Sequence, residues 1–423
     1  MSTTTTIRPT DLRSLRDAVL DTAGTIGIAG AGTAADWAGP LAPVDAVLDT
    51  TGLTGVITHN PGDMTVSVRS GTPLRQLQDE LAPHGQHVSF DAARIADGAT
   101  VGGLVATADA GPAALVFGSL RDLVIGVTIV LADGTVARSG GHVIKNVAGY
   151  DLTKLLHGSH GTLGVLAEVV LRLHPVPERA ATLAIHCSLE EAAEHAATVL
   201  GGPYEPAAME WTSDGVLLIR LEGTADALDA RVQRLRTALG TGELLDLQAH
   251  SDQGADRDRT EQGLPENLGT GPEPGDVPPA ERAAPPSDER PVRRIGTDES
   301  AVRRDEPWER YASLVRGAPE FATLRIGVRP SLLPAVLADL PTESVTAGLG
   351  TGVATVALPP AAVAAAHARV HAAGGTSVLR SRPAGAEVPA WGPPPSAIAV
   401  LRAVKAELDP QGRFGPGRFD PWM

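Results

Sequence analysis

The chain has 423 residues, a net charge of −15, 43% hydrophobic residues and only 3% aromatic residues. This length allows two or three domains with a core built mostly from Val, Leu and Ala. The negative charge argues against nucleic acid or an anionic membrane surface as a partner, because both are bound by clustered Lys and Arg. The single cysteine, Cys187, excludes a disulfide framework and also an internal iron–sulfur cluster, which needs about four thiolates.

No run of apolar residues approaches the roughly 18 positions of a membrane span, and the first residues, MSTTTTIRPT, lack the apolar segment of a secretion signal. We therefore expect a soluble, cytoplasmic protein, with any membrane association made through a partner.

The first elements have clear helix and strand signals. Residues 8–23 predict an amphipathic helix capped by Thr10 or Asp11, and TIGIAG predicts a short strand after it. MTVSVR alternates like a half-buried strand. A helix should follow, with Thr72 as cap, Pro73 in its first position and one apolar face formed by Leu74, Leu77 and Leu81.

Residues 98–111 predict a glycine loop that leads into a helix of small residues. LVIGVTIVLADGTVARSG predicts a hairpin that turns at Asp133 and Gly134. Asp151 can cap a short leucine-rich helix, and VLAEVVLRLHPVP reads as a strand that ends at prolines. This order favours an α+β fold over regular alternation of strands and helices.

Residues 251–307 contain no Phe or Tyr and are rich in Pro, Gly and charged residues, so they predict a disordered acidic and Pro-rich insertion. The segments on both sides, 178–250 and 308–390, predict one smaller α+β domain that this insertion interrupts. Residues 391–423 predict a helix and then a proline–glycine tail.

Three glycine loops are candidate ligand contacts. GIAGAGTAAD (27–36) is close to the dinucleotide fingerprint, but Gly39 and Pro40 would break the helix that a nicotinamide-binding fold needs, so such a fold is a minor alternative. The other loops are GATVGG (98–103) and HGTLGV (160–165), which are ordinary turns when taken singly. We expect the evenly spaced Gly158, Gly161 and Gly164 to leave room for a ligand.

Taken together, GATVGGLVAT, GSLRDLVIGVTIVLADG and KNVAGYDLTKLLHGSHGTLGVLAEV resemble the FAD-binding domain of vanillyl-alcohol-oxidase (PCMH-type) flavoproteins. KNVAGYDLTKL and the tail DPQGRFGPGRF are most similar to FAD-binding subunits of bacterial glycolate oxidases. The resemblance implies a two-subdomain PCMH-type FAD domain over 1–177, a smaller ferredoxin-like α+β cap domain, and a C-terminal segment that packs back on the FAD domain.

The resemblance also implies which residues hold the cofactor. The first loop would wrap the pyrophosphate, the second would pass along the diphosphate and ring, the third would contact the flavin, and a fourth group would shape the floor. The implied residues are Ile28, Ala29, Gly30, Ala31, Gly32, Thr33, Ala34, then Gly98, Ala99, Thr100, Gly102, Gly103 and Thr107 with Ala106, then Thr162, Gly164 and Val165, and for the floor Asn146, Gly149 and Tyr150.

Neither of the first two loops contains Lys or Arg, so backbone N–H groups and helix ends should bind the diphosphate, each helix end contributing roughly 0.3–1 kcal/mol. The family more often has Arg and adjacent glycines where Ala29 and Ala31 stand, and Asn where Gly415 stands. A positive φ at Ala31 would cost about 1–2 kcal/mol.

Histidines offer no clear chemistry. RSGGH (138–142) looks like a covalent flavin attachment sequence, but it lies in the wrong loop, so we expect non-covalent FAD. His157, His160 and His174 are expected in surface or hydrogen-bonding roles, and no metal-ligand spacing occurs. Arg325 and Arg329 are substrate-carboxylate candidates by charge alone, with solvated roles favoured, and no catalytic base is identified.

The resemblance implies an FAD-dependent oxidoreductase: one subunit of a complex that oxidises glycolate or another small 2-hydroxy acid. Its partners would be a catalytic flavoprotein subunit and an iron–sulfur subunit that receives the electrons. Two alternatives stay open. One is an autonomous FAD-dependent hydroxy-acid or alcohol dehydrogenase, and the other is an assembly subunit without flavin.

Overall fold

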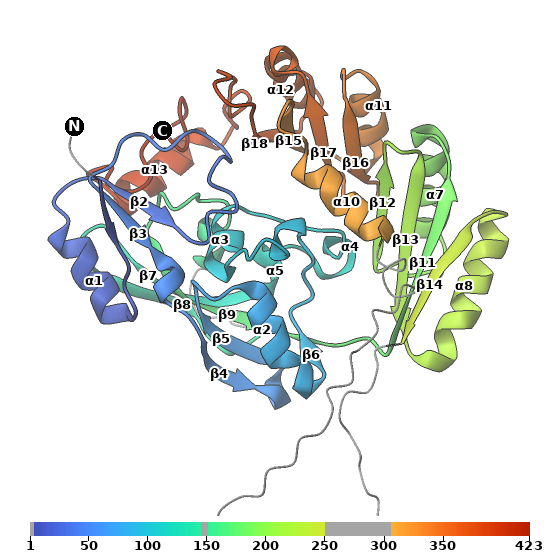
Figure 1. Cartoon of the computed structure of the whole chain (residues 1–423), viewed down its shortest axis with the longest axis horizontal. Helices are drawn as coiled ribbons and strands as arrows, with labels where there is room; N and C mark the ends of the chain where they lie inside the picture. Colours follow the sequence, from blue (N-terminus) through green and yellow to red (C-terminus); the bar gives the residue numbers. More distant parts are fainter. Residues whose placement is uncertain (1–3, 145–150, 250–305) are drawn as a thin grey trace, which may run out of the picture.

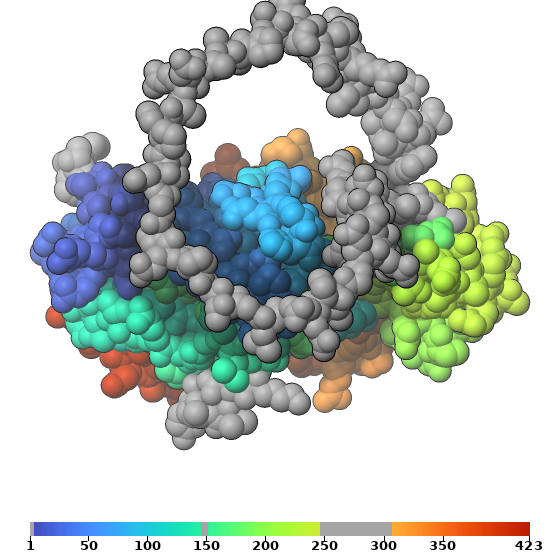
Figure 2. All heavy atoms as spheres, turned by 90° about the horizontal axis from the view of Figure 1, so that it is seen from below, coloured from blue at the N-terminus to red at the C-terminus, as the bar shows by residue number. Residues whose placement is uncertain are grey.

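The structure, a computed structural model, describes residues 4–144, 151–249 and 306–423. The N-terminal part and the C-terminal helix α13 (Ile398–Leu408) lie together at one side, and an eight-stranded sheet with its helices forms the other side (Figure 1). Figure 2 shows an elongated molecule. The N-terminal part, in blue, lies at one end, and the first half of the eight-stranded sheet with its helices, in yellow-green, lies at the other.

The N-terminal part begins with a small parallel sheet in the order β1 (Thr5–Ile7), β3 (Ala46–Asp49) and β2 (Ile26–Ala29). Helix α1 (Leu12–Asp21) packs beside it, and its cap is Asp11, whose Oδ1 accepts a 2.7 Å bond from the Ser14 N–H. No helix follows β2, as Gly39 and Pro40 predict. The C-terminal tail returns to this sheet, because Phe414 is fully buried and forms a parallel bridge with Ile26.

A second sheet is antiparallel, in the order β4 (Val56–Asn60), β5 (Thr65–Arg69), β9 (Val165–Arg172), β7 (Val124–Val130) and β8 (Val136–Gly140). The predicted hairpin joins β7 to β8, with Gly134 at a φ of 79°. The same part of the chain contains five helices, which are α2 (Leu74–Leu81), α3 (Val101–Ala106), α4 (Ala114–Phe117), α5 (Leu120–Leu123) and α6 (Thr153–Leu156). It also contains a two-stranded sheet, in which β6 (Gln86–His87) pairs with β10 (His174–Pro175).

The predicted leucine face of α2 is confirmed, since Leu74, Leu77 and Leu81 are buried. The predicted start of this helix is wrong. Pro73 is the extended N-cap residue and Leu74 is the first helical residue. Thr72 does not cap the helix, because its hydroxyl accepts a bond from the Gly55 N–H at 2.9 Å instead.

The eight-stranded sheet is built from two successive βαββαβ units. The first contains β11 (Arg179–His186), α7 (Leu189–Gly201), β12 (Ala208–Thr212), β13 (Val216–Gly223), α8 (Ala225–Leu239) and β14 (Glu243–Ala249). The second contains β15 (Ala322–Gly327), α11 (Leu333–Ala338), β16 (Ser344–Gly348), β17 (Val353–Leu358), α12 (Val363–Ala372) and β18 (Thr376–Ser381). The units meet where β12 pairs with β16. The predicted α+β class is therefore confirmed, and the structure shows two ferredoxin-like units in one sheet.

Helices α7, α8, α11 and α12 cover one face of this sheet (Figure 1), where their apolar residues share one core with the strands. Helix α10 (Glu306–Arg316) lies on the opposite face, between the sheet and the 3-10 turn at Ala93–Ile95. It begins inside the predicted insertion, so 306 and 307 are helical, and the rest of that segment lies outside the described residues. Within the described ranges, no helix is both long and apolar enough to cross a membrane.

Candidate functional site

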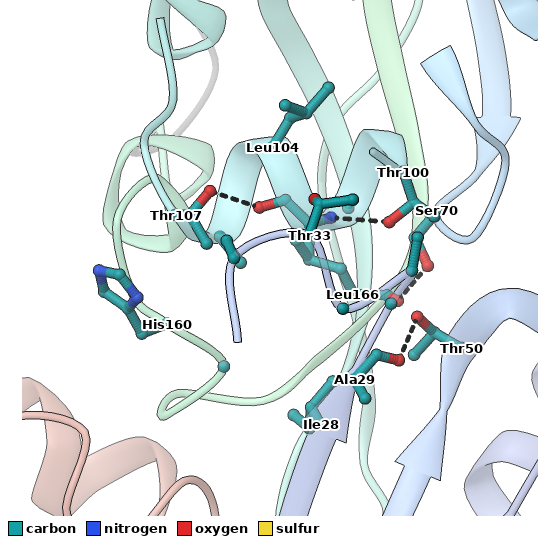
Figure 3. A pocket seen from close by; sticks show the side chains of 18 of the residues that line it. Ile28, Ala29, Thr33, Thr50, Ser70, Thr100, Leu104, Thr107, His160 and Leu166 are labelled. Atoms are coloured by element: carbon teal, nitrogen blue, oxygen red, sulfur yellow. Dashed lines mark hydrogen bonds between the residues drawn. The ribbon is translucent and has the colours of Figure 1, made fainter. Parts of the chain in front are cut away.

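A cavity lies where the three glycine loops meet (Figure 3). It contains about 950 Å³ of space not filled by atoms, part of it open to solvent. Most of its lining comes from the first two loops and from the loop before β9. The lining residues are Ile28 to Ala35, Thr50, Ser70, Arg94, Thr100, Gly102, Gly103, Leu104, Ala106, Thr107, Asp109, Ser159, His160, Gly161, Gly164, Leu166 and Arg418.

The first loop leaves β2 and forms the cavity wall from Gly30 onward. Thr50 fixes the end of the strand, because its hydroxyl donates a 3.0 Å bond to the Ala29 carbonyl (Figure 3). Gly32 has a φ of 77°, which suits glycine, and a Cβ added there would meet nothing within 4 Å. Ala31 is not among the residues with positive φ, so its replacement of a glycine incurs no backbone strain.

The second loop is held closely against its neighbours. The Thr100 hydroxyl caps α3 by accepting a 3.2 Å bond from the Gly103 N–H, and the Thr107 hydroxyl donates to the Gly103 carbonyl at 2.8 Å (Figure 3). A Cβ on Gly30 would lie 2.6 Å from Thr100 Oγ1, and a Cβ on Gly102 would lie 2.8 Å from Ser70 Cβ. Glycine is therefore required here for the close approach of the protein's own segments, which brings two backbones to one cavity.

The third loop carries Gly158, Gly161 and Gly164, which are expected to leave room for a ligand, and Gly161 and Gly164 line the cavity. All three have positive φ, at 81°, 71° and 153°. A Cβ on them would lie 3.3 Å from Ala108, 3.3 Å from Ile28 and 2.6 Å from Ile129, respectively. The absence of a side chain at Gly164 therefore makes space for Ile129, whereas the contacts at Gly158 and Gly161 are tight without being prohibitive.

His160 lies between these glycines and lines the cavity (Figure 3). Its φ of 48° is unusual for a residue with a side chain, and the backbone is held there by a 2.8 Å bond from its N–H to the Ala106 carbonyl. The ring packs edge-on against Trp391 and Phe419. Burial, and secondarily the charges of Arg418 and Arg380, lower the pKa of His160 to about 3, so the ring is neutral at neutral pH.

Two arginines also reach the cavity, and both bind the first loop. Arg94 Nη1 donates to the Thr33 carbonyl at 2.5 Å, and Arg418 Nη1 donates to the Ala35 carbonyl at 2.8 Å. Arg94 Nε is buried and has no hydrogen-bond partner among the residues that the structure describes. The first two loops contain no Lys or Arg, but Arg94 and Arg418 from other segments bring positive charge to the cavity. An unpaired buried N–H at Arg94 suits an anionic group.

The structure gathers many of the predicted cofactor contacts and leaves others away from the cavity. Residues 28–34, Thr100, Gly102, Gly103, Thr107 and Gly164 line it. Gly98, Ala99, Thr162 and Val165 are not among the lining residues. Ala99 and Val165 are buried, and the Thr162 hydroxyl donates to the Ser159 carbonyl at 2.7 Å. Asn146, Gly149 and Tyr150 lie outside the described residues.

No local sequence pattern marks several of the lining residues, including Thr50, Ser70, Asp109 and Arg418. His142 of the RSGGH sequence is not a lining residue, and its Nδ1 lies 2.8 Å from Thr65 Oγ1. The described residues contain no cluster of three or more potential metal ligands.

Comparisons with known proteins identify the domain that supplies the first two loops of this cavity. Residues 6–140 match the model of the FAD binding domain. The chain is 36% identical over 190 residues to the glycolate oxidase subunit GlcE of Escherichia coli (strain K12). This alignment covers 45% of this chain and 53% of GlcE. Over 121 residues it is 40% identical to the subunit GlcD of Bacillus subtilis (strain 168), covering 28% of this chain and 26% of GlcD.

A D-lactate dehydrogenase of Archaeoglobus fulgidus is 39% identical over 142 residues, covering 34% of this chain and 32% of that enzyme. The matches thus span about half the length of GlcE and a third or less of the other two relatives. A solved structure of alkyldihydroxyacetonephosphate synthase superposes with a TM-score of 0.60 over 97% of this chain and 75% of that one. Its 14% identity shows a shared fold alone.

The cavity fits the cofactor that the matched domain model implies. Three loops line it, its first loop leaves open space at Gly32, and Arg94 among its lining residues has a buried Nε without a hydrogen-bond partner in the described part of the chain. Residues 6–140 of this chain therefore form an FAD binding domain, with FAD as the cofactor, and the chain is homologous over part of its length to glycolate oxidase subunits and D-lactate dehydrogenases.

Proposed function

We propose that this chain is the FAD-binding subunit of a complex that oxidises a small 2-hydroxy acid such as glycolate. The observation that supports the proposal most strongly is the cavity shared by residues 28–35, 100–107 and 159–166, because it brings together the loops of an FAD binding domain. The homology to glycolate oxidase subunits and D-lactate dehydrogenases supports hydroxy acids as the substrate class.

In this proposal the first loop and Arg94 hold the diphosphate, and the segment from Ser159 to Leu166 lies beside the flavin with the neutral His160. The backbone N–H groups of the first loop are the main donors, as expected for an acidic protein that binds an anionic cofactor, whereas the N–H groups of Val101, Gly102 and Gly103 at the start of α3 already donate to Thr72, Ser70 and Thr100. When bound, FAD supplies a two-electron acceptor for the oxidation. The FAD is held non-covalently, since His142 is outside the cavity lining and the first loop contains no His or Cys.

The electrons then leave through other chains of the complex. Cys187 is the only cysteine of the sequence, so this chain cannot hold a four-thiolate cluster. We therefore place an iron–sulfur carrier on a second subunit, next to a catalytic flavoprotein subunit. The assignment of residues 1–177 to the FAD domain, of 178–250 with 308–390 to a cap domain, and of 391–423 to a returning segment belongs to this proposal.

The experiment that tests this proposal measures a single reduction of the bound flavin and, separately, sustained oxidation of the hydroxy acid. The purified chain is loaded with FAD and mixed with glycolate or D-lactate without oxygen, and bleaching of the flavin absorption is recorded. Sustained oxidation with an artificial acceptor is then compared with the rate of the co-expressed complex. A subunit role predicts sustained rates well below those of the complex. An equal rate from the chain alone would identify an autonomous dehydrogenase, and a chain that binds no FAD would identify a flavin-less assembly subunit.

A further inference from the structure

A second cavity lies beside the first, between the FAD binding domain and the eight-stranded sheet. It contains about 990 Å³ of space not filled by atoms, part of it open to solvent. Arg325 and Glu210 of the sheet line this cavity, whereas Arg329 is exposed. Asp109 lines both cavities, and Trp37 lines the second. The wall that the two cavities share therefore lies where the cofactor domain meets the sheet.

The indole ring of Trp37 contacts two guanidinium groups in this wall. The guanidinium carbon of Arg380, on β18 of the sheet, lies 3.3 Å from the ring centre, and that of Arg94, on the 3-10 turn at Ala93–Ile95, lies 4.6 Å from it. Trp37 is 3% exposed, so water is excluded from the ring. A cation over an aromatic face is attracted by the ring electrons, most strongly where water is absent. One side chain therefore links an arginine of the sheet to an arginine of the first cavity.

The ring compensates for hydrogen bonds that the two arginines lack. The Nε atoms of Arg94 and Arg380 are buried, and neither has a hydrogen-bond partner in the described part of the chain. Burial lowers the pKa of both groups, and Asp109 offsets this effect in part. Asp109 forms its ion pair with Arg380, at 3.0 Å, and no ion pair with Arg94 occurs within the described ranges. The position of Arg94 therefore depends on the Trp37 ring more than on an acidic partner.

The backbone around Trp37 is fixed from the sheet and from the C-terminal tail. Ala38 has a φ of 61°, which is unusual for a residue with a side chain. Its N–H donates to the Leu379 carbonyl on β18 at 2.8 Å, and its carbonyl accepts a 2.6 Å bond from Arg382 Nη2. The Trp37 carbonyl accepts a 3.2 Å bond from Arg418 Nη1. The ring is therefore held against the sheet by its own backbone.

Arg94 connects this ring to the cofactor cavity. It lines the first cavity, and its Nη1 donates to the Thr33 carbonyl of the first loop at 2.5 Å. Trp37 and Arg380 are not lining residues of that cavity. Thr33 and Trp37 belong to the same segment after β2, so Arg94 contacts this segment at two points. A change at the ring therefore reaches the cofactor site through Arg94.

We propose that Trp37 is a positioning residue for the cofactor. Its ring holds the Arg94 guanidinium at the FAD diphosphate, and Arg380 on the same ring makes FAD affinity depend on the eight-stranded sheet. This assignment rests on the proposed function, in which Arg94 holds the diphosphate. A residue of the sheet that does not line the cofactor cavity thus contributes to cofactor binding.

The first test is titration of the flavin-free chain with FAD. Trp37→Leu removes the ring and is expected to weaken FAD binding by about tenfold, the loss of a cation–π contact away from water. Trp37→Phe keeps an aromatic face and should recover part of the affinity. The matched control is Trp308, whose ring centre lies 5.2 Å from the guanidinium carbon of Arg220 and which lines neither cavity. Trp308→Leu should bind FAD as tightly as the wild type.

A double-mutant cycle tests whether Trp37 acts through Arg94. The chain with both Trp37→Leu and Arg94→Gln should bind FAD no more weakly than Arg94→Gln alone. Trp37→Leu that weakens binding by the same factor with and without Arg94 would overturn the proposal.

Arg380→Lys tests the contribution of the sheet, and it also serves if Trp37→Leu does not fold. It keeps a charge for Asp109 but loses the planar guanidinium, so FAD binding should weaken by about threefold or more. Wild-type FAD affinity in both Arg380→Lys and Trp37→Phe would overturn the role of the ring.

Reduction of the bound flavin by glycolate or D-lactate separates the two proposals. Bound flavin that neither acid reduces, in a chain whose FAD affinity falls in Trp37→Leu, would contradict the proposed function alone. Flavin reduction by either acid, with wild-type FAD affinity in Trp37→Leu and Arg380→Lys, would contradict the role of Trp37 alone.

Discussion

Asp109 and Arg380 form a buried ion pair, with 3.0 Å between Asp109 Oδ1 and Arg380 Nη1, that joins the FAD binding domain to the last strand of the eight-stranded sheet. Both side chains are almost fully enclosed, at 5% and 6% exposure. Asp109 also forms part of the wall of both cavities, so this pair holds the sheet in place beside the cofactor site.

Breaking this pair from one side should strongly destabilise the protein. Asp109→Ala leaves the Arg380 charge buried without its partner, which we expect to lower the free energy of unfolding by about 3–5 kcal/mol. Urea-induced unfolding measures the change. The control is Asp339→Ala, which removes an exposed ion pair with Arg369 and should cost at most about 1 kcal/mol. Equal effects of the two substitutions would contradict the role given to the buried pair.

Gly32 allows a test of the cofactor cavity with a matched control for backbone strain. Gly32 and Gly85 both have positive φ, and a Cβ on either would meet nothing within 4 Å. Alanine at either position should therefore cost about 1–2 kcal/mol of stability. Only Gly32 lines the cavity, so only Gly32→Ala should weaken FAD binding, as measured by titration of the flavin-free chain. Weaker FAD binding in Gly85→Ala by the same factor would mean that strain alone is responsible.

The flavin should be released when the protein is denatured. His142 is engaged with Thr65 outside the cavity lining, and the first loop offers no His or Cys for a covalent bond. His160 is the histidine that does line the cavity, so His160→Ala serves as the comparison. Precipitation with acid should leave all of the yellow colour in the supernatant for the wild type and for His160→Ala. Flavin that stays with the wild-type pellet but not with the variant would identify a bond to His160.

Glu210 should make stability depend on pH. Its pKa is raised in the folded state, mainly by burial and then by Asp91, with Tyr311, Arg325 and Arg380 lining the same cavity. The folded state therefore binds this proton more tightly than the unfolded state does. The stabilising contribution is complete below the ordinary carboxyl pKa and is lost as the pH rises through the folded-state value.

The neutral variant Glu210→Gln should lose less stability over that rising pH range than the wild type. Thermal melting at a series of pH values measures the difference. Parallel stability curves for the two proteins would show that Glu210 does not titrate differently in the folded state.

Local signals allowed much of the fold to be predicted. Asp133 and Gly134 form the turn between β7 and β8, and the leucines of α2 are buried, because both features depend on neighbours within a few residues. Thr72 was a wrong choice of cap because its hydroxyl has a competing partner, the Gly55 N–H, that is distant in the sequence.

The site could be predicted only where glycine patterns mark a loop. Arg418 reaches the first loop from the C-terminal tail, and Arg325 and Glu210 face one cavity from strands that lie more than a hundred residues apart in the chain. Such contacts depend on how the strands pair and leave no local pattern. The glycines of the third loop are predictable as a group, but the close contact of Gly164 with Ile129 depends on a strand distant in the sequence.

Titration of the flavin-free chain with FAD, followed by the visible spectrum and by calorimetry, tests the central claim most directly. The cavity between residues 28–35, 100–107 and 159–166 predicts one FAD bound per chain, with a shifted flavin absorption band and weaker binding in Gly32→Ala. A chain whose spectrum equals that of free FAD, with no heat of binding, would contradict the account.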